Sequence, residues 1–256
     1  MNDLQVIAEG GVLRVTINRP AKRNALSRGL LKDLGEVFAA SSSDQDLKAA
    51  VLRGSGELCF AAGGDLHELS AIDTAEGAEA MASEVKSSLD NIRRFPLPVI
   101  AALNGDAMGG GAELALACDM RIAASHARIG FVQGRINVAT AWGGGVDLMR
   151  LVGPSVALQL LCQGEMIPAH KAAALGLINR VADDGQTLDA LEVDFLAPIL
   201  RQAPHVLRAF KALAYAARSG LPVSELNQLE TRLFSPLWIH EDHWRAVEKL
   251  FAPRDS

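Results

Sequence analysis

The stretch PVIAALNGDAMGGGAELALACD (Pro98–Asp119) decides the fold that the sequence predicts. Its apolar run Val99–Leu103 is bounded by a proline and by Asn104-Gly105, which is typical of a buried strand that ends in a turn. Three glycines, Gly109–Gly111, come next, and strong helix formers follow them. A strand, a glycine turn and a helix start present free backbone N–H groups at the positive end of a helix dipole. Such a place stabilises negative charge, whether it is permanent or forms during a reaction.

Glu113 is the first candidate catalytic residue. It follows Gly110 at helical spacing, so a helix that begins at the glycines would place the Glu113 carboxylate on the same face as the Gly110 amide. A carboxylate beside an anion-stabilising amide is what proton transfer next to a carbonyl group requires. Two other interpretations stay open, because glycine triplets also serve as flexible turns or close-packing devices, and glutamates on helices are usually solvated.

A second glycine turn repeats this arrangement earlier in the chain. The apolar run Cys59–Ala61 leads into Gly63-Gly64, and Asp65 is placed to cap the helix that follows. A free amide at Gly64 would face solvent or a ligand, although an ordinary turn before a helix is the other interpretation. His67 follows this turn, and it either approaches the ligand or caps the short helix at the surface.

The remaining chain predicts an α/β core followed by helices. Strands are expected over residues 12–18, 49–53, 99–103, 119–124 and 127–130. Helices are expected over residues 28–40, 75–94, 143–152, 154–161, 168–175, 188–201, 205–218 and 224–251, the last interrupted near Pro236. This order favours parallel strands covered by helices, with the C-terminal helices as a lid or an oligomerisation element. The glycine clusters near residues 64, 110 and 144 have no fixed period, so no internal repeat is predicted.

Composition excludes several classes of protein. The chain has 256 residues, 49% of them hydrophobic, and a formal net charge of −5. It can bury one large core or two modest ones, and its charge argues against nucleic acid or an anionic membrane surface as the main partner. No apolar run approaches the length of about 18 residues that spans a bilayer, and the first residues lack the pattern of a signal peptide. We therefore expect a cytoplasmic protein whose widely spaced cysteines are reduced and mostly buried.

Four segments, taken together and in this order, resemble the crotonase (enoyl-CoA hydratase/isomerase) family. They are Asn18-Arg19-Pro20 with Asn24–Ser27, then Phe60–Leu66, Asn104–Asp119 and Ala127–Gly153. The resemblance implies a crotonase-like β/α superhelix over residues 1–197 and a C-terminal helical segment over residues 198–256. It also implies a homotrimer, or a hexamer made of two trimers, in which the helical segment contributes to the interface and to the active site.

The resemblance implies an acyl-CoA thioester as the substrate, and no cofactor besides the coenzyme A that the substrate carries. By motif match, the amides of Gly64 and Gly110 would hold the thioester oxygen and stabilise an enolate, and Glu113 would be the first catalytic glutamate. The residues implied to line the substrate path are Lys22, Arg23, Ala25, Leu26, Ala62, Asp65, Leu66, His67 and Trp142. Lys22 and Arg23 would meet the CoA phosphates, or they are ordinary solvated cations.

The sequence departs from the family pattern at two places. Gln133 stands where the resemblance places the second catalytic glutamate. A glutamine keeps the hydrogen bonding of a glutamate, but it does not exchange a proton at neutral pH. The segment Thr140–Trp142 differs as well, and Trp142 is expected to narrow the acyl end of the pocket. This Trp-Gly-Gly variant resembles a subgroup that includes acyl-CoA decarboxylases.

Several functions stay open at this point. Hydratase-like lyase chemistry on an enoyl-CoA is the first hypothesis. Decarboxylation of a malonyl-type acyl-CoA is the second, because it needs no base to begin and one acid to finish, and a single-glutamate enoyl-CoA isomerase is the third. A non-catalytic acyl-CoA binder, or an RNA-binding member of the family, is the alternative from another class, with the acidic net charge against RNA.

His240 and His243 have helical spacing that could bind a metal ion. No third ligand pattern accompanies them, so a solvated helix start is the favoured interpretation and no metal site is predicted. The sequence also lacks the motifs of a nucleophile elbow, a phosphate-binding loop and a dinucleotide-binding turn. Nucleophilic hydrolysis, nucleotide hydrolysis and nicotinamide chemistry are therefore not expected.

Overall fold

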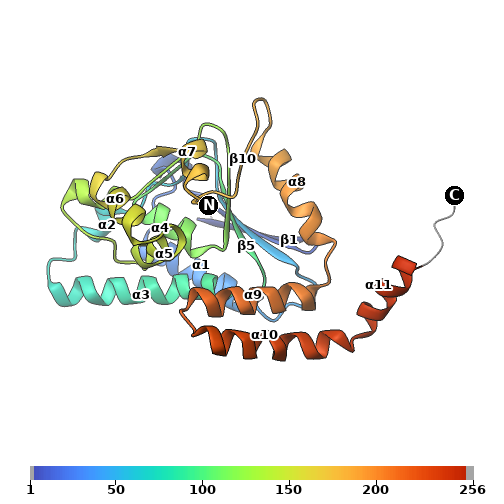
Figure 1. The fold of residues 1–256 in the computed structure, drawn as a ribbon. Helices are drawn as coiled ribbons and strands as arrows, with labels where there is room; N and C mark the ends of the chain where they lie inside the picture. Colours follow the sequence, from blue (N-terminus) through green and yellow to red (C-terminus); the bar gives the residue numbers. More distant parts are fainter. Residues whose placement is uncertain (1–2, 252–256) are drawn as a thin grey trace.

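The computed structural model describes residues 3–251 and contains two β-sheets surrounded by helices (Figure 1). The strands are β1 (Leu4–Glu9), β2 (Val12–Ile17), β3 (Ala49–Gly54), β4 (Cys59–Ala61), β5 (Val99–Leu103), β6 (Asp106–Met108), β7 (Met120–Ala123), β8 (Arg128–Gly130), β9 (Ile167–Pro168) and β10 (Arg180–Val181). The α-helices are α1 (Arg28–Ser41), α2 (Leu66–Leu69), α3 (Ala75–Arg93), α4 (Gly110–Ala117), α5 (Gly144–Val152), α6 (Pro154–Gln163), α7 (Ala169–Ala174), α8 (Leu188–Leu200), α9 (Pro204–Arg218), α10 (Val223–Trp238) and α11 (Glu241–Phe251). Two 3-10 turns, η1 (Pro20–Lys22) and η2 (Gln133–Ile136), complete the list.

The chain winds between the two sheets. The larger sheet has the order β1-β2-β3-β5-β7-β10 and is parallel except for the β1–β2 hairpin. The smaller sheet has the order β4-β6-β8-β9, in which β4, β6 and β8 are parallel. Each of β3, β5 and β7 is followed directly by a strand of the smaller sheet. The core is therefore a superhelix of strand pairs separated by helical segments, as the α/β prediction implies.

The smaller sheet determines where a site can form. Because β4, β6 and β8 are parallel, their carboxyl ends meet at one edge. The turns that leave this edge are residues 62–65, 109–110 and 131–133, and the first two contain the glycines singled out in the sequence. In open α/β structures, ligands bind outside the carboxyl ends of the strands.

Helices α1 and α3 pack against each other and cover the core on one side. The Ser27 hydroxyl accepts the N–H of Leu30 at 3.2 Å and caps α1. The apolar stripe of α1 is buried, including Leu34 and Phe38, and the Phe38 ring meets Phe95 edge to face. Helix α3 ends at Arg93, which is buried and points toward the site described below.

Several local predictions were wrong. β6 lies between the Asn104-Gly105 turn and the glycine triplet, and β1, β9 and β10 were not predicted. Strands of two or three residues have no detectable period, which explains β6, β9 and β10. The break between α10 and α11 falls after Trp238, whereas Pro236 lies inside α10. Pro168 precedes α7 as its cap residue instead of lying in its first turn.

The C-terminal helices carry an exposed apolar surface. α9 and α10 lie side by side, and α11 projects away from the sheets (Figure 1). The exposed large apolar side chains here include Phe210, Val223, Phe234, Trp238, Ile239, Trp244, Leu250 and Phe251. Exposed apolar surface of this kind is typical of an interaction site. The trimer or hexamer stays a prediction, as does the boundary between the core and the C-terminal segment at residues 197/198, which falls inside α8.

Among the helices described within residues 3–251, none combines the length and the apolar composition that a bilayer span requires.

A close backbone contact joins α4 to the end of β4. A Cβ atom at Gly111 would lie 2.0 Å from the carbonyl oxygen of Ala61. We therefore expect Gly111→Ala to lower the free energy of unfolding by at least about 1–3 kcal/mol, because the backbone has to shift. Gly29→Ala is the matched control, since a Cβ at Gly29 on α1 meets nothing within 4 Å, and its effect is neutral or stabilising by up to about 1 kcal/mol. Urea unfolding measures the free energy of unfolding of both variants. Equal changes in Gly111→Ala and Gly29→Ala would contradict the close contact at Gly111.

Candidate active site

Two glycine turns meet at the edge of the smaller sheet. Gly63 (φ 100°) and Gly109 (φ 55°) adopt left-handed conformations that disfavour other residues. A Cβ atom at Gly63 would lie 3.1 Å from the carbonyl oxygen of Met108 and 3.4 Å from the amide nitrogen of Gly110. The turn after β4 and the turn after β6 are therefore in direct backbone contact.

The amides of Gly64 and Gly110 are unpaired in this contact. Leu26 pairs with Gly64 as an isolated parallel bridge: the Leu26 N–H donates to Gly63 (2.8 Å), and the Asp65 N–H donates to Leu26 (2.9 Å). This pattern turns the Gly64 N–H away from Leu26, while Gly110 is the first residue of α4 and has no intrahelical acceptor. Within residues 3–251, neither N–H donates a hydrogen bond. Two free amides thus lie on adjacent turns.

The indole ring of Trp142 covers both glycines. A Cβ atom at Gly110 would lie 2.2 Å from Cζ3 of Trp142, and one at Gly64 would lie 3.3 Å from its Cη2. The residue is only 5% exposed. The ring therefore packs on the Cα side of both glycines, and any side chain at Gly110 would displace it.

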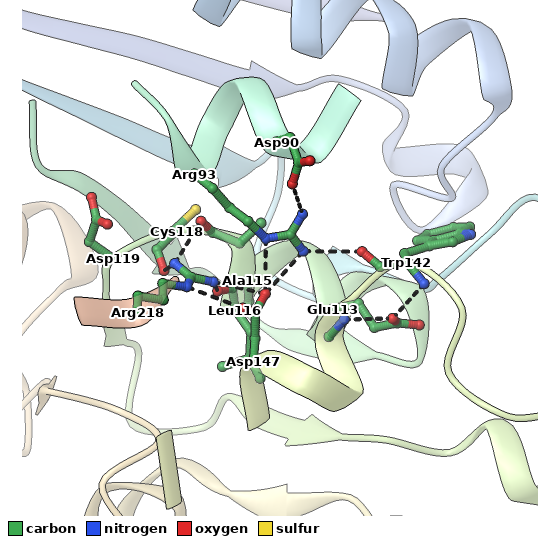
Figure 2. Close-up of polar contacts among 12 residues, drawn as sticks. Asp90, Arg93, Glu113, Ala115, Leu116, Cys118, Asp119, Trp142, Asp147 and Arg218 are labelled. Carbon is green, nitrogen blue, oxygen red and sulfur yellow. Dashed lines mark hydrogen bonds and ion pairs between the residues drawn. The ribbon is translucent and has the colours of Figure 1, made fainter. Parts of the chain in front are cut away.

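Glu113 is a buried carboxylate with fixed hydrogen-bond partners. It is 2% exposed, and its Oε2 accepts the N–H groups of Trp142 and Gly144, each at 2.9 Å (Figure 2). These donors belong to the third glycine cluster of the sequence, at the start of α5. Burial raises the pKa of Glu113 above its ordinary value, and the hydrogen bonds from Gly144, Trp142 and Gln133 oppose this shift.

Gln133 faces Glu113 across the site. Its Nε2 donates to Oε1 of Glu113 at 2.9 Å. Its own Oε1 is buried and has no hydrogen-bond partner among the described residues. Because buried polar atoms are normally paired, this oxygen is available to accept a hydrogen bond from a water molecule or a substrate hydroxyl.

The sequence model of the family described as enoyl-CoA hydratase/isomerase matches residues 8–252. The chain belongs to the enoyl-CoA hydratase/isomerase family. It is 35% identical to a short-chain-enoyl-CoA hydratase from Clostridium acetobutylicum, over 82% of this chain and 80% of that protein. It is 33% identical to a 2,3-dehydroadipyl-CoA hydratase from Escherichia coli, over 99% of this chain and 97% of that protein.

Solved structures of the enoyl-CoA hydratase/isomerase family have the same fold. An enoyl-CoA hydratase/carnithine racemase from Magnetospirillum magneticum superimposes with a TM-score of 0.91 at 34% identity, covering 99% of this chain and 94% of that chain. An enoyl-CoA hydratase from Bacillus anthracis superimposes with a TM-score of 0.90 at 28% identity, covering 97% of this chain and 96% of that chain. The predicted crotonase-like α/β fold with a C-terminal helical region is confirmed.

The structure brings part of the predicted substrate path together. Ala25 and Leu26 run beside the turn Gly63–Asp65, and the Ala62 N–H donates to the carbonyl of Arg23 at 3.1 Å. Leu66 and His67 are exposed on α2. Their contact with a substrate stays a prediction.

The charged residues of this path pair with one another. Asp65 occupies the cap position of α2, but the predicted side-chain cap is wrong, because its carboxylate accepts Arg19 at 3.1 Å instead. The exposed Lys22 lies 3.7 Å from Asp65. The exposed Arg23 lies 3.9 Å from Asp106. Both cations are accessible at the surface next to the Ala25–Leu26 segment, and their pairing with CoA phosphates stays a prediction.

Sequence reasoning missed the groups that hold Glu113. The amides of Trp142 and Gly144 were not predicted as its partners, although the triplet Gly143–Gly145 at a helix start was a usable signal for free N–H groups. A buried cluster of Arg93, Asp147 and Arg218 next to this turn was also missed (Figure 2). These side chains come from α3, α5 and α9, so no local pattern connects them.

The histidines of the C-terminal helices group differently from the sequence expectation. His205 stacks on His240 with ring centroids 4.2 Å apart, and with Asp242 they offer three possible metal ligands within 4.8 Å of one another. Of the predicted pair His240 and His243, this group contains only His240, and its other members are Asp242 and, from α9, His205. However, Nδ1 of His240 accepts the Asp242 N–H at 3.2 Å, which leaves Nε2 carrying the proton in the neutral ring.

The raised pKa of Glu113 predicts a pH-dependent stability. The folded state binds the Glu113 proton more tightly than the unfolded state, so this group stabilises the fold at pH values below the pKa of an unfolded glutamate. That contribution is lost as the pH rises through the higher pKa of the folded state. We expect the free energy of unfolding of the wild type, relative to Glu113→Gln, to fall across this window. Urea unfolding of both proteins from about pH 4 to about pH 8 measures it, and a difference that is constant or rises with pH would contradict the prediction.

Proposed function

We propose that this protein is an acyl-CoA enzyme with hydratase-like lyase activity on an enoyl-CoA. Glu113 carries the proposal: it is a buried, fixed carboxylate on the helix whose first amide, Gly110, is free and lies beside the turn of Gly64. The relatives named above are hydratases, which supports this reaction. The proposal requires no cofactor besides the CoA of the substrate, and it places Lys22 and Arg23 at the CoA phosphates.

The proposed mechanism uses the two amides and one carboxylate. The thioester oxygen accepts hydrogen bonds from Gly64 and Gly110, and one such donor is typically worth about 3 kcal/mol of barrier. Glu113 removes a proton from a water molecule as the water oxygen bonds to the β-carbon, and the electron pair of the double bond forms the enolate. Glu113 then returns the proton to the α-carbon. The unpaired Oε1 of Gln133 orients the water by accepting its other hydrogen.

Decarboxylation of a malonyl-type acyl-CoA is the second candidate function. The side chain that faces Glu113 is an amide instead of a second carboxylate, and the raised pKa of Glu113 favours its acid form. In this reaction the bond to the carboxylate carbon breaks, CO₂ leaves, and the electron pair stays on the substrate as an enolate held by the two amides. Glu113 then donates one proton to the α-carbon. A single-glutamate isomerase would use the same groups.

Turnover assays with the purified protein distinguish these functions. We expect hydration of crotonyl-CoA, with Glu113→Gln slower by about 10²–10⁴-fold because the proton-transfer group is lost. Gln133 can rotate its amide to pair with the new side chain, so the variant is expected to keep its fold. Unchanged turnover in Glu113→Gln would remove the assigned role of Glu113.

Two other results would replace the first proposal. Release of CO₂ from methylmalonyl-CoA or ethylmalonyl-CoA without hydration of crotonyl-CoA would establish decarboxylation. Thermal stabilisation by CoA thioesters without turnover of any of them would indicate a binding protein.

Trp142 is expected to limit the length of the acyl group. Its ring stands over Gly64 and Gly110, so Trp142→Leu opens space next to the reacting carbons. We expect the ratio of kcat/KM for a long enoyl-CoA over crotonyl-CoA to rise by about tenfold or more, since small volume changes in apolar pockets discriminate by this order. Val193→Ala, at an exposed apolar residue of α8 outside the C-terminal helical segment, is the control. An unchanged ratio in Trp142→Leu would show that the ring does not border the acyl chain.

A further inference from the structure

We propose that Arg93 is a positioning residue that holds the Trp142–Gly144 turn where its amides fix the Glu113 carboxylate. This inference rests on the proposed role of Glu113. Arg93 does not contact Glu113 itself, so it acts through the turn.

Arg93, at the end of α3, makes three different side-chain contacts, and one of them is with this turn. Its Nη2 donates to the carbonyl oxygen of Trp142 at 3.1 Å, and its Nε donates to Asp147 at 3.0 Å (Figure 2). Its Nη1 donates to Asp90 on the same helix at 2.9 Å. Only 9% of the residue is exposed. A buried guanidinium with every branch engaged has little freedom to move, so it can serve as a rigid support.

The backbone of Trp142 is held from both sides. Its carbonyl oxygen accepts Arg93, and its N–H donates to Glu113. The next residue, Gly143, has a φ of 94°, and a Cβ atom there would lie 2.8 Å from Nη2 of Arg93. The guanidinium therefore packs directly on the glycine backbone. This contact fixes the position of the turn relative to the Glu113 carboxylate.

Asp147 completes the support of Arg93, and the second arginine that Asp147 binds, Arg218, provides a control. Its second oxygen accepts Nε of Arg218 at 3.1 Å, so one buried carboxylate pairs with two arginines. Arg218 otherwise donates to the carbonyl groups of Leu116, Ala117 and Cys118 at the end of α4. The two arginines share Asp147, but only Arg93 contacts the turn that holds Glu113.

Loss of Arg93 has a specific chemical consequence. The turn would relax, and the Trp142 and Gly144 N–H groups would bind the ionised Glu113 carboxylate less well. Its protonation midpoint would therefore move to higher pH. Whether Glu113 acts as the base or as the acid of the reaction, the limb of the pH–rate profile that it controls moves in the same direction.

The test compares Arg93→Met with Arg218→Met on the best substrate. We expect Arg93→Met to shift the limb of the pH–rate profile that Glu113 controls to higher pH by about one unit. This is the size expected for one weakened hydrogen bond to a charged group. Arg218→Met should lower the unfolding midpoint in urea and leave this limb in place. An infrared difference spectrum, taken against Glu113→Gln in each background, reports the protonation of Glu113 without turnover. Equal profiles in both arginine variants would overturn the inference.

A second variant covers the case in which Arg93→Met does not fold. Arg93→Met combined with Asp147→Asn also replaces the buried carboxylate that would lose one of its two arginines, yet it still leaves the Trp142 carbonyl without its donor. We expect this protein to fold and to keep the shifted limb, and a wild-type profile would overturn the inference. Arg93→Lys should restore the profile only in part, because one ammonium group replaces a fork of donors. If Glu113→Gln keeps full turnover, the proposed function fails instead, which separates the two outcomes.

Discussion

The close approach of backbone segments at glycine is the constraint on which the site depends. A Cβ atom at Gly111 would lie 2.0 Å from the Ala61 carbonyl, and one at Gly144 would lie 2.3 Å from Cγ of Glu113. Each contact joins two segments that a side chain would separate. The three glycine clusters of the sequence therefore converge on one place, where they supply free N–H groups, a wall of backbone and the partners of a buried carboxylate.

Holding the Glu113 carboxylate in its ionised form inside the protein costs free energy, and the surrounding polar groups reduce that free-energy cost. Burial disfavours the charged form of Glu113, whereas three N–H donors favour it, and the net pKa remains raised. A carboxyl group with a raised pKa holds a proton more readily than an ordinary glutamate, which suits it to proton transfer. Arg93 and Arg218 lie further from the site and bind carbonyl groups and Asp147, and Arg93 alone of the two contacts the turn, without pairing with Glu113 directly.

Much of the local structure was predictable from the sequence. The buried runs of β3 and β5 and the cap at Ser27 have clear patterns, and the sequence alone indicates the glycine turns at Gly64 and Gly110 as candidate anion sites. The repetition of strand pairs was not predictable, because β3, β5 and β7 begin at Ala49, Val99 and Met120 and are therefore unequally spaced. The long helix α3 is inserted in only one of the intervals.

The sequence by itself determined several of the strands, including β2, β3 and β5, together with the glycine turns and the family to which the chain belongs, because these depend on local periodicity, glycine placement and motif order. Only the tertiary structure decided what Glu113 contacts. Its donors at Trp142 and Gly144, and the support of Arg93 by Asp147, join α3, α4 and α5. The pKa of a carboxylate depends on the burial and hydrogen bonds created when distant segments pack, and no local pattern in the chain encodes those contacts.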